Sequence, residues 1–104
     1  MLMTSTDGVP GRNIVQVFGV ATGNTVRAKH IGRDIAAGLK NLIGGELTGY
    51  TELLTEAREE AIGRMVAQAE SMGANAIVNV RFATSSVAQG AAELFAYGTA
   101  VRVE

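Results

Sequence analysis

Two kinds of metal ligand are scarce in this chain of 104 residues, which contains no cysteine and a single histidine, His30. Without cysteine, neither a disulfide nor a thiolate metal site can form. Thioether sulfur is the remaining soft ligand, but Met65 and Met72 occupy apolar positions of a helical pattern, where methionine usually fills core space. We therefore predict no metal site within one copy and keep His30 as the sole candidate for a metal ligand.

Charged and aromatic residues are also scarce. Charged residues make up 18% of the chain, aromatic residues 5%, and the net charge is −1. Nucleic-acid-binding proteins usually carry a basic surface and aromatic rings for stacking, so we expect no nucleic-acid partner. No apolar run approaches the roughly 20 residues that span a bilayer, and the first residues lack the pattern of a secretory signal. We expect a cytoplasmic protein with no membrane partner and no cofactor.

The same composition favours self-association. The length predicts one domain over residues 1–104. Apolar residues make up 47% of the chain, while the charged fraction is well below the usual quarter. A domain this small has a high ratio of surface to volume, and so few charges cover a monomer poorly. We expect part of the surface to be buried between identical copies.

The strongest periodicity predicts a long helix from about Glu46 to Met72. Apolar residues recur there at steps of three and four, which places them on one face. They are Leu47, Tyr50, Leu54, Ala57, Ala61, Met65, Ala69 and Met72. Gly44 and Gly45 break any helix before this run, and Gly73 is placed to adopt the left-handed conformation that ends one. Arg58 interrupts the apolar face, so its guanidinium must reach the edge or a carboxylate.

Alternating apolar residues predict three strands, at Ile14–Ala21, Ala76–Thr84 and Ala91–Val103. A short helix is predicted over 32–43, and residues 1–5 form either a short strand or a frayed end. We predict an α+β fold: a β-α-β-β split antiparallel three-stranded sheet in two layers, with a short and a long helix on one face. The third strand is central, and the first two strands are parallel to each other.

One face of the predicted sheet has no cover. The helices occupy one face, whereas the strands carry apolar residues on both. On the last strand, Phe95 and Tyr97 lie opposite Gly98, whose small size offers a shallow groove to a helix. The other apolar face has no element of the chain left to cover it. We therefore predict a homo-oligomer that buries this face between copies.

A set of short motifs extends from about Gly11 to Val103. They are Gly19-Val20, Thr22-Gly23, Asp34-Ile35-Ala36-Ala37-Gly38, Gly44-Gly45-Glu46, Tyr50, Ala57-Arg58, Ala61, Arg64-Met65, Gly73-Ala74-Asn75-Ala76, Arg81-Phe82, Thr84-Ser85 and Tyr97-Gly98-Thr99-Ala100-Val101. Each is common alone, but their combination resembles the YbjQ-like family. The resemblance implies a dodecin-like β-α-β-β subunit in a ring-shaped homopentamer. It also carries the description "putative heavy-metal-binding domain", and it implies no particular site residue.

The sequence contains no recognisable catalytic constellation. No serine lies in a Gly-x-Ser-x-Gly turn, and a Ser-His-carboxylate set would have to use His30. The glycines from Gly19 to Gly23 follow a strand but lack the spacing of a phosphate-binding loop. We predict that the protein is not an enzyme.

Four polar residues stand in otherwise apolar surroundings: Glu46, Tyr50, Arg58 and Glu93. Buried polar groups need partners, so we expect them to bond to one another or across a subunit boundary. One interpretation is a pocket between subunits that holds a small anion on Arg58. The other is a packing or interface network, which the sequence favours.

These observations lead to two hypotheses. The first is a non-enzymatic, homo-oligomeric scaffold or binding protein, whose pentameric state comes from the family resemblance alone. The alternative is a heavy-metal- or oxyanion-binding protein whose site is completed between subunits. Retention of an ion, lost on changing His30 or Arg58, would distinguish the second from the first.

Overall fold

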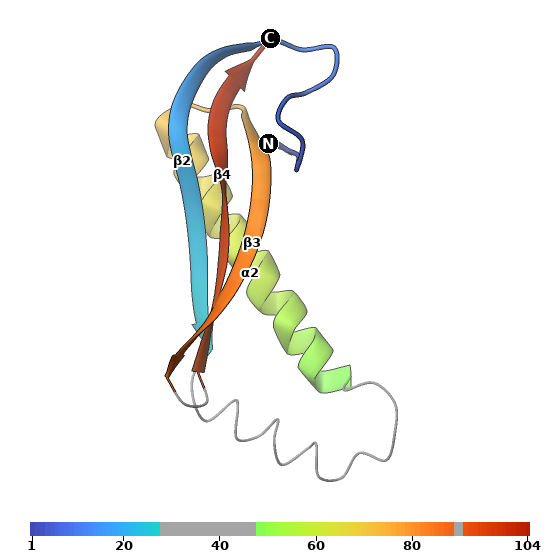
Figure 1. Cartoon of the computed structure of the whole chain (residues 1–104), viewed down its shortest axis with the longest axis vertical. Coiled ribbons are helices and arrows are strands. Elements are labelled where there is room, and N and C mark those ends of the chain that lie inside the picture. Colours follow the sequence, from blue (N-terminus) through green and yellow to red (C-terminus); the bar gives the residue numbers. More distant parts are fainter. Residues whose placement is uncertain (28–47, 89–90) are drawn as a thin grey trace.

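A long helix lies across one face of a four-stranded mixed sheet (Figure 1). The computed structural model of the protein describes residues 1–27, 48–88 and 91–104. The elements in chain order are β1 (Leu2–Met3), β2 (Ile14–Arg27), α2 (Thr48–Met72), β3 (Ala76–Ala88) and β4 (Ala91–Val103). Within those ranges, no helix has the length and apolar character needed to span a membrane.

The strand order is β1-β3-β4-β2. Because β4 is antiparallel to both β2 and β3, those two strands are parallel to each other, as predicted. The sheet is mixed and four-stranded, not purely antiparallel, because β1 joins β3 in parallel. The α+β class and the central last strand are confirmed. The short helix predicted over 32–43 lies outside the described residues, as do Gly44 and Gly45.

Two strands are longer than the sequence predicted. β2 continues to Arg27, so the prediction that this strand ends at Ala21 was wrong. β3 continues to Ala88, where a loop was expected. Both extensions pair with β4, placing Asn24 opposite Phe95 and Ser85 opposite Glu93. Small and polar residues form strand here because pairing with a long central strand overrides weak intrinsic propensity.

Irregular pairing along β2 moves side chains between the two faces of the sheet. The register with β4 shifts between Ile14 and Gln16 and again between Val17 and Gly19. Each extra residue interrupts the strict alternation of a strand. Ile14, Val17 and Val20 consequently lie opposite alternate residues of β4 and share one face. The strict alternation predicted for Ile14–Ala21, which would place Val17 on the face opposite to Ile14, was therefore wrong.

The apolar face of α2 packs on the sheet only in its second part. The buried residues on this face are Ala57, Ala61, Met65 and Ala69. They confirm the predicted stripe, whereas Leu54 is 39% exposed. Figure 1 shows the reason: α2 crosses the sheet diagonally, and its first turns extend past β3.

The helix ends at Gly73, as its sequence position predicted. Gly73 has a φ of 95°, which a glycine adopts without a steric penalty. Its N–H donates to Glu70 O at 3.0 Å, and Ala74 N–H donates to Ala69 O at 3.1 Å. This pair of bonds is a Schellman motif, which satisfies carbonyl groups that the last turn would leave free.

Gly23 lets α2 lie directly against β2. A Cβ atom at this position would overlap the helix backbone at Ala61 O and Met65 N. The groove predicted at Gly98 receives a side chain of the neighbouring strand and not the helix. The space beside Gly98 is filled by Ile77, whose Cγ2 lies 2.6 Å from where a Cβ would be. The close approach of helix and sheet therefore depends on Gly23, and Gly98 accommodates the neighbouring strand β3.

The N-terminal segment covers part of the face opposite α2. A buried cluster on this face consists of Ala76, Val78, Val101 and Val103. Val9 packs against it. Backbone bonds hold the segment in place: Thr4 N–H donates to Ile77 O, and Val80 N–H donates to Thr4 O, each at 3.0 Å. The expectation that no element of the chain reaches this face was wrong, although only one end of the face is covered.

We predict that Gly23→Ala lowers the free energy of unfolding by about 1–3 kcal/mol, because the added methyl group forces α2 away from β2. Gly63→Ala is the matched control. Gly63 lies exposed in the same helix with no outside atom within 4 Å of an added Cβ. Alanine should there stabilise the helix by up to about 1 kcal/mol.

Urea unfolding of both variants at one protein concentration checks this prediction. A Gly23→Ala variant with the parent chain's midpoint would show that α2 does not need the close approach.

Candidate functional site

The described members of the predicted polar set do not meet. Arg58 is exposed on α2, so its predicted place in a buried face was wrong. It directly follows Ala57, which is buried and whose carbonyl accepts a bond from Thr25 of β2. Glu93 is half-buried on β4 and accepts a bond from Asn24 Nδ2 at 3.0 Å. Glu46 lies outside the described residues, and the side chain of Tyr50 is outside the description although its backbone belongs to α2.

A row of polar side chains instead joins α2 to the outer edge of β2. Glu60, Arg64 and Gln68 are spaced four residues apart and therefore lie on one side of the helix. Gln68 Oε1 accepts a bond from the backbone N–H of Thr22 at 2.6 Å. Arg64 Nη1 donates to the backbone carbonyl of Asn24 at 2.5 Å. Arg64 Nη2 also donates to Glu60 Oε1 at 2.5 Å, so a carboxylate holds the guanidinium in this position.

This row caps the edge of the sheet. β2 is an outer strand, and outward backbone groups on such a strand can recruit a strand of another chain. Arg64 and Gln68 bond two of these groups, which blocks strand addition at Thr22–Asn24. The sequence did not predict this row because the first strand was expected to end at Ala21, before Thr22 and Asn24. The spacing of Glu60, Arg64 and Gln68 was the available signal.

An apolar patch lies on the face of β2 that points away from α2. We call it the valine patch and define it as Val17, Val20, Val26 and Tyr97. The exposed fractions of these side chains are 63%, 61%, 52% and 36%. Tyr97 pairs with Thr22 next to Val20, and the pair of Asn24 with Phe95 separates Thr22 from Val26 on this face. Several exposed apolar side chains that share one face of a sheet are typical of an interaction surface.

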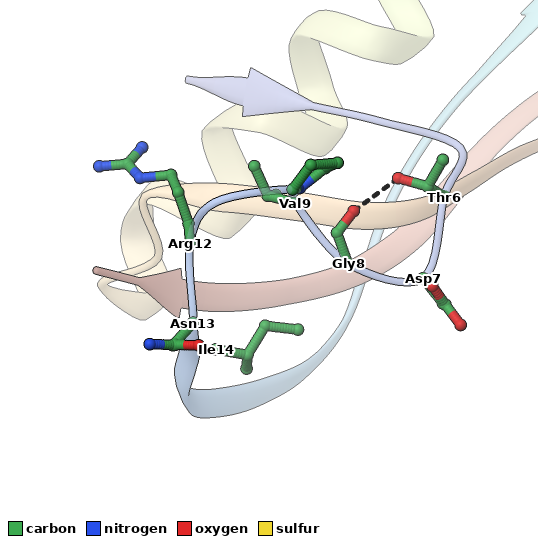
Figure 2. Close-up of a pocket in the computed structure, with 8 residues that line it drawn as sticks. Thr6, Asp7, Gly8, Val9, Arg12, Asn13 and Ile14 are labelled. Carbon is green, nitrogen blue, oxygen red and sulfur yellow. Dashed lines mark hydrogen bonds between the residues drawn. The ribbon is translucent and has the colours of Figure 1, made fainter.

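A hollow of about 540 Å³ lies beside the N-terminal segment. Its lining residues are Thr6, Asp7, Gly8, Val9, Pro10, Arg12, Asn13 and Ile14. Figure 2 shows the segment curling around the hollow, with Thr6 Oγ1 donating to Gly8 O at 2.6 Å. Asp7 and Arg12 project to opposite sides of it. No pair of charged groups converges there, so the hollow offers little to fix a charged ligand.

The side chains of the described residues do not fit a heavy-metal ion. No group of three or more histidine, aspartate or glutamate side chains is placed to hold one within those ranges. Met65 is fully buried and Met72 packs beside it, so their sulfur atoms belong to the core. His30 lies outside the described residues. No metal chemistry follows from the geometry that is described.

The chain is similar to known proteins along its whole length. The sequence profile of the YbjQ family, described as "Putative heavy-metal-binding", matches residues 1–104. A UPF0145 protein of Hahella chejuensis is 67% identical over 104 residues, which is 100% of both chains. A UPF0145 protein of Archaeoglobus fulgidus is 57% identical over 103 residues, covering 99% of this chain and 95% of its own.

A solved structure of a protein of unknown function from Pediococcus pentosaceus has the same fold. Its TM-score is 0.61 at 18% identity, and the match covers 100% of this chain and 98% of that one.

We predict that Arg64→Ala lowers the free energy of unfolding by about 1 kcal/mol, because α2 loses a hydrogen bond to β2. The opened edge should also increase aggregation at high protein concentration. Glu59→Ala is the control, since Glu59 is an exposed, charged residue of the same helix. Its free energy of unfolding should stay within about 0.5 kcal/mol of that of the parent chain.

Urea unfolding and light scattering measure the two effects. Equal behaviour of both variants would mean that Arg64 does not cap the strand.

Proposed function

The chain belongs to the YbjQ family of uncharacterised UPF0145 proteins, and on that premise we propose that it is a non-enzymatic, homo-oligomeric scaffold or binding protein. The observation that carries this proposal is the valine patch. Three valines on one face of β2 are more than half exposed in the single chain. We further propose a ring of five copies, a number that rests on the family resemblance.

The size of the valine patch limits what kind of contact it can make. Burying the exposed half of a valine contributes about 1 kcal/mol, so Val17, Val20 and Val26 together contribute about 3 kcal/mol. Association costs an estimated 4–15 kcal/mol in lost freedom of motion. The patch alone is therefore too small to hold two copies together. A stable assembly must bury other surface in the same contact.

The polar chemistry of the described residues supports binding or scaffolding more than catalysis. Arg64 and Gln68 are engaged with backbone groups of β2. Glu93 accepts a bond from an amide and faces no basic partner among the described residues. A catalytic acid or base needs a partner and a place for substrate, and this arrangement supplies neither within the described ranges.

A second candidate is an oxyanion- or metal-binding protein whose site is completed between subunits. The family's description favours it, and so does Arg58, which makes no hydrogen bond or ion pair with the described part of the chain. Elemental analysis after dialysis against mixed divalent cations, and separately against arsenate, tests this candidate. This candidate requires that the protein retain an ion in a stoichiometric amount. The retained amount should fall on His30→Ala if the ion is a cation and on Arg58→Gln if it is an anion.

We predict that Val20→Asp breaks the oligomer without unfolding the chain. Val20 is 61% exposed in one copy, so the carboxylate is tolerated there. In an interface, an unpaired carboxylate costs several kcal/mol. Sedimentation velocity should show a large species for the parent chain and a smaller one for the variant.

Ala67→Asp is the control, because it adds the same charge at an exposed position of α2. It should sediment like the parent chain. A parent chain that is monomeric at micromolar concentration would overturn the proposed function, and a Val20→Asp variant of parental size would exclude the valine patch from the interface.

A further inference from the structure

We propose that Met3 is an oxidation site, and that its conversion to the sulfoxide by a peroxide loosens the N-terminal segment from the sheet. This segment, residues 1–9, lies beside the start of β3 and covers one end of the face opposite α2 (Figure 1). We call it the strap. The inference goes beyond the proposed function, because it concerns a different part of the chain from the valine patch and does not require self-association.

Backbone atoms join the strap to β3. Thr4 makes two of these bonds, donating to Ile77 O and accepting from Val80 N–H, each at 3.0 Å. Thr6 O accepts a third bond from Asn79 N–H at 2.9 Å. When the strap opens, each of these bonds is exchanged for a bond to water, so its net contribution is small. The apolar contacts of the strap's side chains therefore have a large influence on how often it opens.

Strand β3 is distorted where it meets the strap. Its register with β4 shifts between Val78 and Arg81, and Asn79 has a φ of 54°. Neighbouring N–H groups of a regular strand point to opposite edges, but here those of Asn79 and Val80 both bond to the strap. A positive φ is uncommon outside glycine, and asparagine tolerates it better than most residues. Opening of the strap removes the partners of two adjacent amides, whose hydrogen exchange therefore reports on it.

Met3 makes the contact of the strap on the helix side of the sheet. It pairs in parallel with Ile77, so the two side chains point to the same face. Ile77 is fully buried in the core cluster beneath α2. Met3 is 41% exposed, so more than half of its surface is covered by the chain while the rest stays open to solvent. Met3 therefore combines an apolar contact with access for a small oxidant.

Met3 differs from the other methionines of the chain in its position. The chain contains no cysteine, so the sulfur of its four methionines is the only sulfur open to oxidation. Met65 is fully buried, and Met72 packs against the core cluster. Met1 is 42% exposed, but it precedes β1, whose pairing with β3 begins at Leu2. Met3 is therefore the exposed methionine whose side chain lies within the paired part of the sheet.

The modification is the transfer of one oxygen atom to Met3. Hydrogen peroxide gives this atom to the thioether sulfur: an S–O bond forms, the O–O bond breaks, and the peroxide leaves as water. The sulfur loses two electrons and becomes a sulfoxide, which is polar and accepts hydrogen bonds. Beside Ile77 the sulfoxide loses bonds to water whenever the strap closes, and that cost favours the open strap. A methionine sulfoxide reductase reverses the change.

An open strap enlarges the apolar face opposite α2. Val9 then leaves the cluster that contains Val78 and Val101, both at most 2% exposed while the strap is closed. Val101 pairs with Val17 of the valine patch, so the newly exposed surface adjoins that patch. Oxidation of one methionine therefore changes how much apolar surface the sheet presents.

Peptide mapping by mass spectrometry gives the first test. Dilute hydrogen peroxide, added to the parent chain, should oxidise Met3 and leave Met65 reduced. Oxidation of Met65 at the rate of Met3 overturns the proposal, because access would then not distinguish the strap from the core.

Hydrogen exchange followed by NMR gives the second test. The amides of Asn79 and Val80 should exchange about fivefold faster after oxidation, because a partly buried polar group favours opening by roughly that factor. The amide of Ala74 is the internal reference. It donates to Ala69 O at 3.1 Å at the end of α2 and should keep its rate. Unchanged rates at Asn79 and Val80 in a chain with oxidised Met3 overturn the proposal.

Three variants separate Met3 from the other residues of the strap. Met3→Leu keeps the apolar contact but has no sulfur to oxidise, so peroxide should leave its exchange rates unchanged. Met1→Leu retains Met3 and should respond like the parent chain. Met3→Gln places a polar group at this position and should exchange fast at Asn79 and Val80 without peroxide. A Met3→Leu variant that responds like the parent chain overturns the proposal.

The response of the parent chain is decisive even where a variant does not fold. Sedimentation of the parent chain before peroxide treatment keeps this inference separate from the proposed function. A monomer overturns the proposed self-association and leaves the strap inference standing. An oligomer whose Met3 stays reduced leaves self-association standing and overturns the strap inference.

Discussion

The fold depends on how closely α2 lies against β2. Because Gly23 has no side chain, the helix backbone at Ala61 and Met65 reaches the strand directly. This proximity lets Arg64 and Gln68 extend over the strand and bond its outer backbone groups. The helix thus covers one face of the sheet and also closes part of one edge. Other molecules are left with the opposite face, where the valine patch lies.

Elements set by local periodicity were predictable from the sequence. The buried stripe of α2, its end at Gly73 and the central strand β4 all follow from the spacing of apolar and small residues. Features set by contacts between distant segments could not be predicted from the sequence. The extension of β2 depends on pairing with β4, and its bulges are invisible to an alternating pattern. A helical wheel placed Arg58 on the buried face but could not indicate how much of that face the sheet covers beside Ala57.

In the candidate site, too, the local pattern was predictable and the long-range contacts were not. The sequence identified unpaired polar groups but not which of them meet. The role of Arg64, which binds β2, was overlooked because its partner Asn24 is 40 residues away and was expected to lie beyond the end of the first strand. The assembly hypothesis depended less on such detail, since an apolar sheet face needs a cover whichever residues form it. Val9 supplies part of that cover, and the remaining surface is the one we assign to a neighbouring copy.

The central claim is that the exposed sheet face is buried between copies, and native mass spectrometry of the untagged protein tests it most directly. A tag would add histidines to a chain that has one. The measurement counts subunits and detects retained ions in the same spectrum. Our account predicts one closed oligomer, a pentamer, without bound ions. A monomer at micromolar concentration would contradict it, and a pentamer that retains stoichiometric ions would favour a binding site between subunits.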